Sequence, residues 1–296
     1  MPFSSCLLPS GYDLPVPLPP LSCTVRGCGL PLERRERTWH CPRGHSFDIA
    51  RSGYVNLLQP QDRTSPEAGD SREAVEARAL LLAAGIGRGV IDTVTHALNA
   101  LDLAPDSVVV DVGAGTGDAL GLAASRWPLT YAGIDLSTAA AEHAARRFPS
   151  VTWVVANADR GLPLTDRSVD VVLSLHARRL PAECARVLKL AGALIVAVPA
   201  PDDLIELRAL IQGEGVERER TDALVSEHAP WFSLQERATT RERRTLGREH
   251  LLALLRSTYR GARVSAAARL ESLEQLEVTL ASDVCLFRIL PTGRGR

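Results

Sequence analysis

The sequence of 296 residues lacks any run of about 18 apolar residues free of charge, the length that a membrane-spanning helix needs. Its start lacks a basic segment before an apolar one, so we expect no secretory signal and a soluble, cytoplasmic protein without a membrane partner. Six cysteines are too few for a disulfide framework in so long a chain. The net charge of −1 excludes a global field that would draw the whole protein toward nucleic acid.

The chain nevertheless holds enough apolar sequence, 45% of its residues, for one large core and a smaller second unit. Three of the six cysteines fall between positions 23 and 41, and such clustering in a reducing cytosol indicates metal binding. Charge is uneven, because residues 21–63 contain seven arginines and four acids, a balance of +3 that leaves −4 for the rest. Solvated surface is the simplest interpretation of these arginines, and contacts with RNA phosphates are the alternative.

Four segments follow one another along the chain. Residues 1–20 carry six prolines without periodicity, which predicts a disordered tail. Residues 21–60 carry the cysteine cluster and short β-like pieces, so we expect a small metal-binding domain there. Residues 61–105 begin with a polar linker broken by proline and glycine and continue into helices, the first of them capped by Asp70-Ser71. Residues 106–296 make up the main domain.

The main domain alternates strands with helices. The β-branched run Val108-Val109-Val110 predicts a strand that is buried on both faces. The alternation predicts an α/β fold with a parallel, doubly wound sheet that helices cover on both sides. Two late β-like runs, 262–266 and 276–289, predict a closing hairpin. The expected strands are 107–112, 130–135, 151–156, 169–174 and 192–198, and the expected helices are 88–101, 117–126, 138–147, 181–190, 202–212 and 247–256.

A glycine loop with the sequence DVGAGTG, from Asp111 to Gly117, follows the first of these strands and opens the next helix. Glycines allow a sharp turn and let a ligand approach the main chain, and open α/β sheets bind ligands at the carboxyl ends of their strands. Asp135 ends the next strand, 24 residues after Asp111, where a carboxylate can accept both hydroxyls of a ribose. The candidate ligand-binding residues are Asp111, Gly113, Ala114, Gly115, Gly117, Asp135 and Leu136.

Two cofactors suit a glycine loop followed by a ribose-binding acid. Nicotinamide dinucleotides use G-x-G-x-x-G, which places a pyrophosphate on the helix N-terminus. The loop here is G-x-G-x-G, with Asp111 in front of it and Asp118 behind it. Acids repel a pyrophosphate, whereas they attract the amino group of a methionine moiety. The loop therefore predicts S-adenosylmethionine, with a purely structural turn as the alternative.

The strand ends that follow resemble those of the class I methyltransferases, which have a Rossmann-like fold. In that class a polar residue after the third strand meets the adenine, and the fourth strand ends near the methyl group. The resemblance implies adenine contacts from Asn157 and Ala158, and a position near the methyl group for Ser174. Capping of a turn by Asn157 is an equal alternative.

A second motif, Cys23-x4-Cys28-x12-Cys41-x3-His45, supplies two close pairs of metal ligands. This spacing is typical of tetrahedral zinc, and because protein ligands fill every position we expect a structural Zn²⁺. A unit of about forty residues with few large apolar side chains needs such metal binding in order to fold. His40 competes with His45, but neighbouring strand residues point in opposite directions, which favours His45 beside Cys41. Free thiols beside an unrelated histidine are the alternative.

The cysteine pairs, the stretch FDIARSGYVNLL from Phe47 to Leu58, Gly69-Asp70-Ser71 and the glycine loop together resemble the RlmA family. These enzymes are 23S ribosomal RNA guanine-N1 methyltransferases. The resemblance covers residues 21–260, and it implies an enzyme whose zinc domain helps to grip a hairpin in domain II of 23S rRNA. It also implies a link to macrolide resistance, as in the actinobacterial, TlrB-like branch.

Three segments on the substrate side depart from that family. Where the family has lysine-proline-glycine-glycine, this chain has Lys189-Leu-Ala-Gly192. The family's alanine-proline after the fourth strand is replaced by His176-Ala-Arg178, and its late aromatic-rich stretch is represented only by Arg256-Ser-Thr-Tyr259. His176 is the candidate catalytic base, because it follows the fourth strand and a neutral histidine can accept the proton of guanine N1. Positioning in line with the sulfonium is the alternative source of acceleration. Splayed RNA bases could stack on Trp39 or Tyr54.

Two other functions stay open at this point. One is a small-molecule methyltransferase whose zinc domain is only a lid, which the altered substrate-side segments would permit. The other is a non-catalytic RNA-binding protein that keeps the fold. The sequence also leaves both a monomer and a homodimer open.

Overall fold

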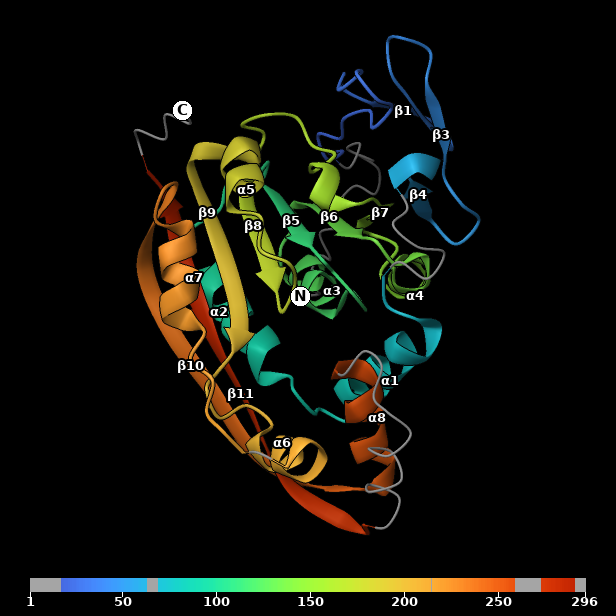
Figure 1. Ribbon diagram of the computed structural model, residues 1–296. Helices are drawn as coiled ribbons and strands as arrows, with labels where there is room; N and C mark the ends of the chain where they lie inside the picture. Colours follow the sequence, from blue (N-terminus) through green and yellow to red (C-terminus); the bar gives the residue numbers. More distant parts are fainter. Residues whose placement is uncertain (1–16, 63–68, 214, 259–272, 291–296) are drawn as a thin grey trace, which may run out of the picture.

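The computed structural model describes residues 17–62, 69–213, 215–258 and 273–290. Its centre is an eight-stranded sheet of order β10-β11-β9-β8-β5-β6-β7-β4, and a small sheet of order β1-β2-β3 lies beside it (Figure 1). The strands are β1 (Glu33–Arg35), β2 (Thr38–His40), β3 (Ser46–Asp48), β4 (Tyr54–Asn56), β5 (Val108–Val112), β6 (Thr130–Asp135), β7 (Thr152–Val155), β8 (Val169–Leu175), β9 (Leu188–Pro199), β10 (Phe232–Gly247) and β11 (Gln275–Ile289). The helices are α1 (Arg72–Ala83), α2 (Gly89–Asn99), α3 (Asp118–Arg126), α4 (Thr138–Arg147), α5 (Pro181–Val187), α6 (Ile205–Gln212), α7 (Thr221–His228) and α8 (Arg248–Thr258).

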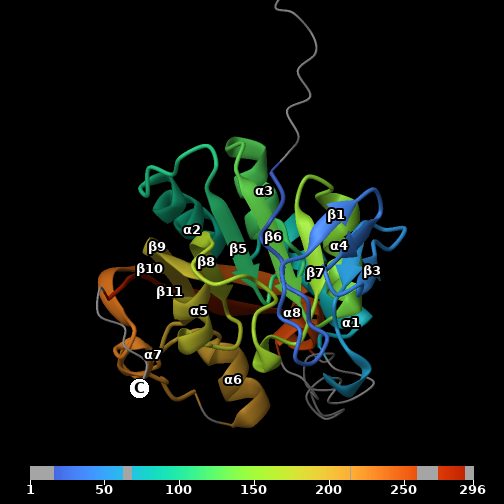
Figure 2. The ribbon, with the colours of Figure 1, turned by 90° about the horizontal axis from the view of Figure 1, so that it is seen from above.

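The predicted parallel, doubly wound sheet is confirmed. The strands from β4 to β9 pair in parallel, and β11 and β10 extend the sheet in antiparallel fashion. All five residues of β5 are buried, with Val109 packing on one face and Val110 on the other. Helices on both sides exclude water from the central strands, which explains the unbroken β-branched run. Figure 2 shows α2 and α3 on one side of the sheet and α5 and α7 on the other.

The segment that carries the cysteines packs into the main core. Leu21, Trp39 and Leu57 are each at most 1% exposed and belong to the same buried cluster as Val110. β4 pairs with β7 as the edge strand of the large sheet, so the short strand expected in the metal-binding unit belongs to the main sheet. Because Trp39 is a core residue, the idea that it stacks on an RNA base is wrong. Tyr54 is half-buried.

The end of the predicted disordered tail is ordered where the structure describes it. Residues 1–16 lie outside the described part, but Pro19 is buried and the Pro20 carbonyl accepts a bond from Thr165 N at 3.0 Å. Leu21 continues this contact as a β-bridge with Leu164. The expectation of disorder therefore fails for residues 17–20, because their main chain has partners near β8.

A third apolar cluster joins α1, α6 and α8 to the far end of the β10–β11 pair, through residues such as Leu81, Leu207, Leu254 and Val278. Figure 1 shows α1 and α8 side by side beyond the ends of the central strands. The expected cap of the first helix is confirmed, since Ser71 Oγ accepts a bond from Ala74 N at 3.3 Å. The helix pair thus covers the edge of the sheet where the glycine loop lies.

Several sequence expectations need correction. The predicted hairpin partner 262–266 lies outside the described residues, and β11 pairs instead with β9 and with β10, a strand that we did not predict. Helix α7 was also not predicted. The helix expected over 181–190 ends at Val187, because β9 already begins at Leu188. Of the helices in the described residues, none has both the length and the apolar character of a membrane span.

Candidate functional sites

The glycine loop joins β5 to α3 at the carboxyl edge of the sheet. Gly113, Gly115 and Gly117 have positive φ angles of +78°, +55° and +78°, a region that disfavours residues with a Cβ. A Cβ on Gly113 would lie 2.5 Å from the Cβ of Ala177. The Ile134 carbonyl accepts bonds from Gly113 N at 2.8 Å and from Ala114 N at 3.1 Å, which fixes the loop on β6. The loop is therefore a fixed main-chain cradle.

Asp135, at the end of β6, is bonded directly to this cradle. One carboxylate oxygen accepts a bond from Gly115 N, and the other accepts a bond from Ser137 N, both at 2.8 Å. Burial raises the pKa of Asp135, while these two N–H bonds oppose the rise. A carboxylate oxygen can accept more than one bond, so Asp135 can also receive ligand hydroxyls. The structure thus brings together the predicted loop and the predicted acid, with half-buried Leu136 next to them.

Asp111 lies at the start of the loop and is only 2% exposed. Its Oδ1 atom is buried and has no hydrogen-bond partner in the part of the chain that the structure describes. Burial, and after it the charge of Asp135, raises the pKa of Asp111 to about 8. A buried acceptor without a donor is costly and rare in native proteins. A cationic N–H group is the ligand chemistry that would satisfy this carboxylate.

Asn157 follows β7, and its side chain is engaged at both ends. Its Nδ2 donates to the Asp62 carbonyl at 2.9 Å, and its Oδ1 accepts a bond from Asp159 N at 3.0 Å. The side chain of Asn157 therefore caps the turn after β7, which was the alternative to an adenine contact. An adenine contact from Asn157 and half-buried Ala158 would have to use main-chain groups.

Ser174 and His176 lie at the end of β8, beside the cradle. Ser174 is buried, and its hydroxyl lies 3.5 Å from the Arg178 carbonyl. His176 has a φ of +54°, its Nε2 is 3.0 Å from Ser282 Oγ, and the residue is exposed. Loss of solvent around its ring, and after it the charges of Arg78 and Arg220, lowers the pKa of His176 to about 4. His176 is therefore neutral at cytosolic pH.

The metal ligands predicted from spacing also come together. The sulfur atoms of Cys23, Cys28 and Cys41 and a ring nitrogen of His45 all lie within 4.8 Å of one another. His45 Nδ1 is 3.4 Å from Cys23 Sγ and 3.3 Å from Cys41 Sγ, and the sulfurs of Cys28 and Cys41 are 3.8 Å apart. Such separations are those between ligands of one tetrahedral ion with bonds of about 2.0–2.3 Å. His45 rather than His40 lies in the cluster.

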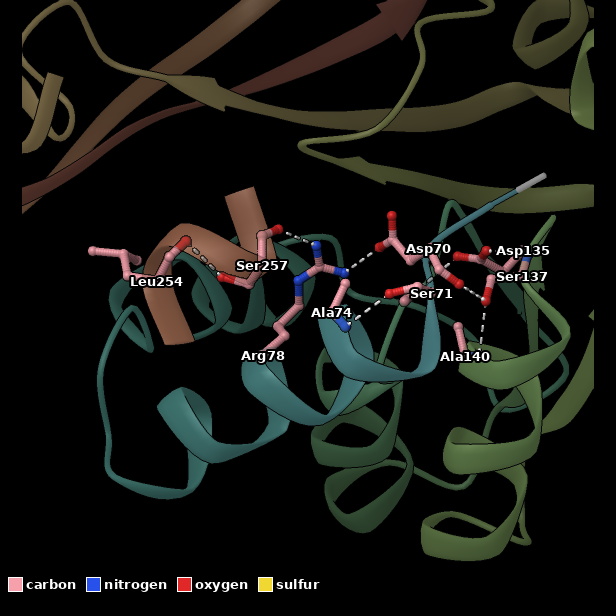
Figure 3. Close-up of polar contacts among 10 residues, drawn as sticks. Asp70, Ser71, Ala74, Arg78, Asp135, Ser137, Ala140, Leu254 and Ser257 are labelled. Atoms are coloured by element: carbon pink, nitrogen blue, oxygen red, sulfur yellow. Dashed lines mark hydrogen bonds and ion pairs between the residues drawn. The ribbon is translucent and has the colours of Figure 1, made fainter. Parts of the chain in front are cut away.

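Arg78 is a residue of this region that sequence reasoning missed. It lies on α1, far from the loop in sequence, and its guanidinium bonds to the Asp70 carboxylate and to the Ser257 carbonyl (Figure 3). A Cβ on Gly115 would lie 3.1 Å from Arg78 Nη1. No local motif marks such a residue, because only the packing of α1 onto the sheet edge brings it to the loop.

Comparison with known proteins covers both parts of the chain. Residues 22–66 match the family model described as "RlmA, N-terminal", and residues 109–192 match one described as "Methyltransferase domain". The 23S rRNA (guanine(748)-N(1))-methyltransferase of Streptomyces fradiae is 34% identical over 275 residues, which are 89% of this chain and 95% of that protein. A protein of Micromonospora griseorubida, provisionally named a 23S rRNA (guanine-N(1)-)-methyltransferase, is 33% identical over 93% of this chain and 98% of its own length. This chain belongs to the RlmA family.

As an RlmA-family protein it is an S-adenosylmethionine-dependent methyltransferase with a zinc-ribbon Cys3His site. Three features of the structure fit the methyl donor: a cradle with three glycines, a strand-end acid beside it, and the unsatisfied acceptor of Asp111. The donor set of three thiolates and one imidazole fits zinc, and it leaves no position of a tetrahedral coordination sphere open to water. The zinc site of this RlmA-family chain is therefore structural.

Proposed function

We propose that this RlmA-family enzyme transfers the methyl group of S-adenosylmethionine to N1 of a guanine in 23S rRNA. The similarity to the Streptomyces fradiae guanine(748)-N1 methyltransferase carries the proposal, because it extends over the zinc-binding segment as well as the methyltransferase domain. Both modules that an enzyme of this kind uses are thus on one chain. Because rRNA is the substrate, we place the reaction in the cytoplasm.

The charge of the zinc-binding segment supports an RNA substrate. Its six arginines within the described residues are all exposed. Exposed arginines of this density are suited to phosphate contacts, which give affinity without reading sequence. A cavity of about 890 Å³ lies between this segment and the turn after β7, and Arg160 is among its lining residues. The arginines are Arg26, Arg34, Arg35, Arg37, Arg43 and Arg51.

The donor supplies a methyl group on a positively charged sulfur, so the acceptor needs orientation and loss of the N1 proton. We propose that His176 takes part by orienting the guanine. Its neutral ring can accept a hydrogen bond from N1–H, but a group with a pKa of about 4 holds a proton poorly at cytosolic pH. The proton then passes on to water. The cradle and Ser174 hold the reacting groups at the strand ends, where alignment accounts for most of the acceleration.

The test uses purified zinc-loaded protein, labelled S-adenosylmethionine and 23S rRNA from cells that lack the modification. We expect label in the RNA, and mass spectrometry of nuclease fragments to find N1-methylguanine in a hairpin of domain II. Labelling should fall with added salt, because phosphate contacts release counterions. His176→Gln should lower kcat more than it raises KM for RNA.

Each other result contradicts the proposal in a distinct way. Label only in small molecules would favour a small-molecule methyltransferase with the zinc unit as a lid. Salt-sensitive RNA binding together with donor binding, but without turnover, would favour a non-catalytic RNA-binding protein. Methylation at another atom would change the chemistry assigned here.

Two finer points belong to the same proposal. We propose that methylation lowers macrolide sensitivity, which growth of a strain with and without the gene would measure. We also propose a homodimer, because β10 is a long edge strand at one side of the sheet. Light scattering after size exclusion would give the mass.

A further inference from the structure

Arg78 has fixed partners on both sides of the glycine loop. Its Nη1 donates to Asp70 Oδ2 at 2.8 Å, and its Nη2 donates to the Ser257 carbonyl near the end of α8 at 2.9 Å. Figure 3 shows the side chain extending between these two groups. Its side chain is 34% exposed. The guanidinium therefore has a defined position between α1 and α8.

The start of α1 is in turn fixed to the edge of the sheet. The Asp70 carbonyl accepts a bond from Ser137 Oγ at 2.6 Å, and Ser137 N donates to the Asp135 carboxylate. A Cβ on Gly69 would lie only 2.6 Å from Ser137 N. This contact places α1, and with it Arg78, at a set distance from the glycine loop.

The guanidinium lies over the main chain of the loop. Its Nη1 would be 3.1 Å from a Cβ on Gly115, which is the residue whose N–H bonds to Asp135. The charge of Arg78 also reaches two neighbouring strand ends: it opposes the rise that burial causes in the pKa of Asp135, and it adds to the fall that burial causes in the pKa of His176. A positive charge thus faces the point where β5, β6 and β8 end.

The surroundings of this charge are acidic. Asp70, Asp111 and Asp135 lie around the same loop, and Asp111 is buried with an unsatisfied oxygen. A methionyl group carries a carboxylate as well as an ammonium group and a sulfonium. The acids attract the two cationic groups of the ligand, whereas its carboxylate is attracted by a positive side chain such as that of Arg78. A guanidinium has further N–H donors beyond the two that Arg78 uses, in the planar arrangement that matches a carboxylate.

We propose that Arg78 binds the α-carboxylate of the methyl donor, opposite Asp111, which faces its α-ammonium group. The assignment depends on use of the donor and not on the rRNA acceptor. Arg78 is then a binding residue supplied by the helix cover, whereas the loop supplies the cradle.

The test compares two ligands by calorimetry: S-adenosylhomocysteine, and its decarboxylated analogue in which hydrogen replaces the α-carboxylate. We expect the wild-type protein to bind S-adenosylhomocysteine about 10- to 100-fold more tightly, the range for a charge-assisted hydrogen bond. Arg78→Gln should lose that same factor for S-adenosylhomocysteine and bind the analogue as the wild type does. Arg78→Lys should keep part of the preference, since it keeps the charge.

Arg72→Gln is the matched control, because Arg72 lies on the same helix but is exposed and bonds to Glu142. It should leave both affinities unchanged. Equal weakening of both ligands by Arg78→Gln would overturn the proposal, since it would mean that Arg78 only bridges α1 to α8. Retained preference in Arg78→Gln would overturn it as well. Absence of rRNA methylation would not change either affinity, so the two proposals fail separately.

Discussion

Replacement of Asp111 by asparagine should make the protein more stable at neutral and alkaline pH. The asparagine has nearly the same shape as a protonated aspartate but cannot ionise. In the wild type, burial beside Asp135 raises the pKa of Asp111 to about 8, while the unfolded chain keeps the ordinary value of 3.8. Between these two values the folded state holds a proton that the unfolded state has lost. Unfolding therefore becomes easier as pH rises through this window.

The magnitude follows from the width of the window. Each pH unit changes the free energy of unfolding by about 1.4 kcal/mol per proton. Between about pH 5 and pH 8 the wild type should lose about 4 kcal/mol relative to Asp111→Asn, and above about pH 9 the difference should level off. Below about pH 3 the carboxyl group is protonated in both the folded and the unfolded wild type, so it gives no pH dependence there. Asp135 remains in both proteins, and where Asp111 is protonated its neighbour is neutral in both, so its titration differs little between them below about pH 7.

Urea unfolding of both proteins, followed by circular dichroism across this pH range, measures the difference. Asp106→Asn is the control, because Asp106 is exposed in the turn before β5. Parallel stability curves for the wild type and Asp111→Asn would refute the reasoning. They would mean that water reaches the buried oxygen and that the carboxyl group is ionised in the folded protein.

Three further predictions follow from the two sites. Binding of S-adenosylhomocysteine should tighten as pH rises toward about 8, because the ligand ammonium group favours ionised Asp111; calorimetry showing a flat profile would contradict this. Cys28→Ser should release zinc and lower the melting temperature, because the ion supplies folding energy to a small segment that binds it with four ligands; a chelator assay that still finds one zinc per chain would count against it. Gly113→Ala should weaken donor-product binding and stability more than Gly213→Ala. Both glycines have φ near +79°, but a Cβ would lie 2.5 Å from the Cβ of Ala177 at Gly113 and would meet no atom within 4 Å at Gly213. Equal effects in a thermal shift assay would show that the clash with Ala177 is unimportant.

Local patterns were sufficient for the central strands and helices. The runs around Val110 and Ile134 are buried on both sides by helices, so hydrophobicity alone marks them. The capping serine at position 71 and the glycine loop are also local features, and both occur where the sequence predicts them. The boundary between α5 and β9 was misplaced by a few residues, because the residues around Lys189 suit either element and pairing with β8 decides.

Long-range pairing explains the larger errors. β4 has three residues and pairs with β7, about a hundred positions away, so nothing near Tyr54 indicates its place in the main sheet. β10 is polar along much of its length and exposed, and it becomes a strand because β11 pairs with it over fifteen positions. Its sequence alone has too few apolar residues to predict a strand.

Local sequence patterns were enough to identify the chemistry of both sites. The glycine loop with its acids indicated the methyl donor, and the spacing of the cysteines and His45 indicated zinc, because both depend on residues close together in the chain. The contact of Arg78 with the loop, the raised pKa of Asp111 and the capping of a turn by Asn157 became visible only in the folded chain. Those properties arise from burial and from contacts between α1, α8 and the strand ends, which no local pattern records.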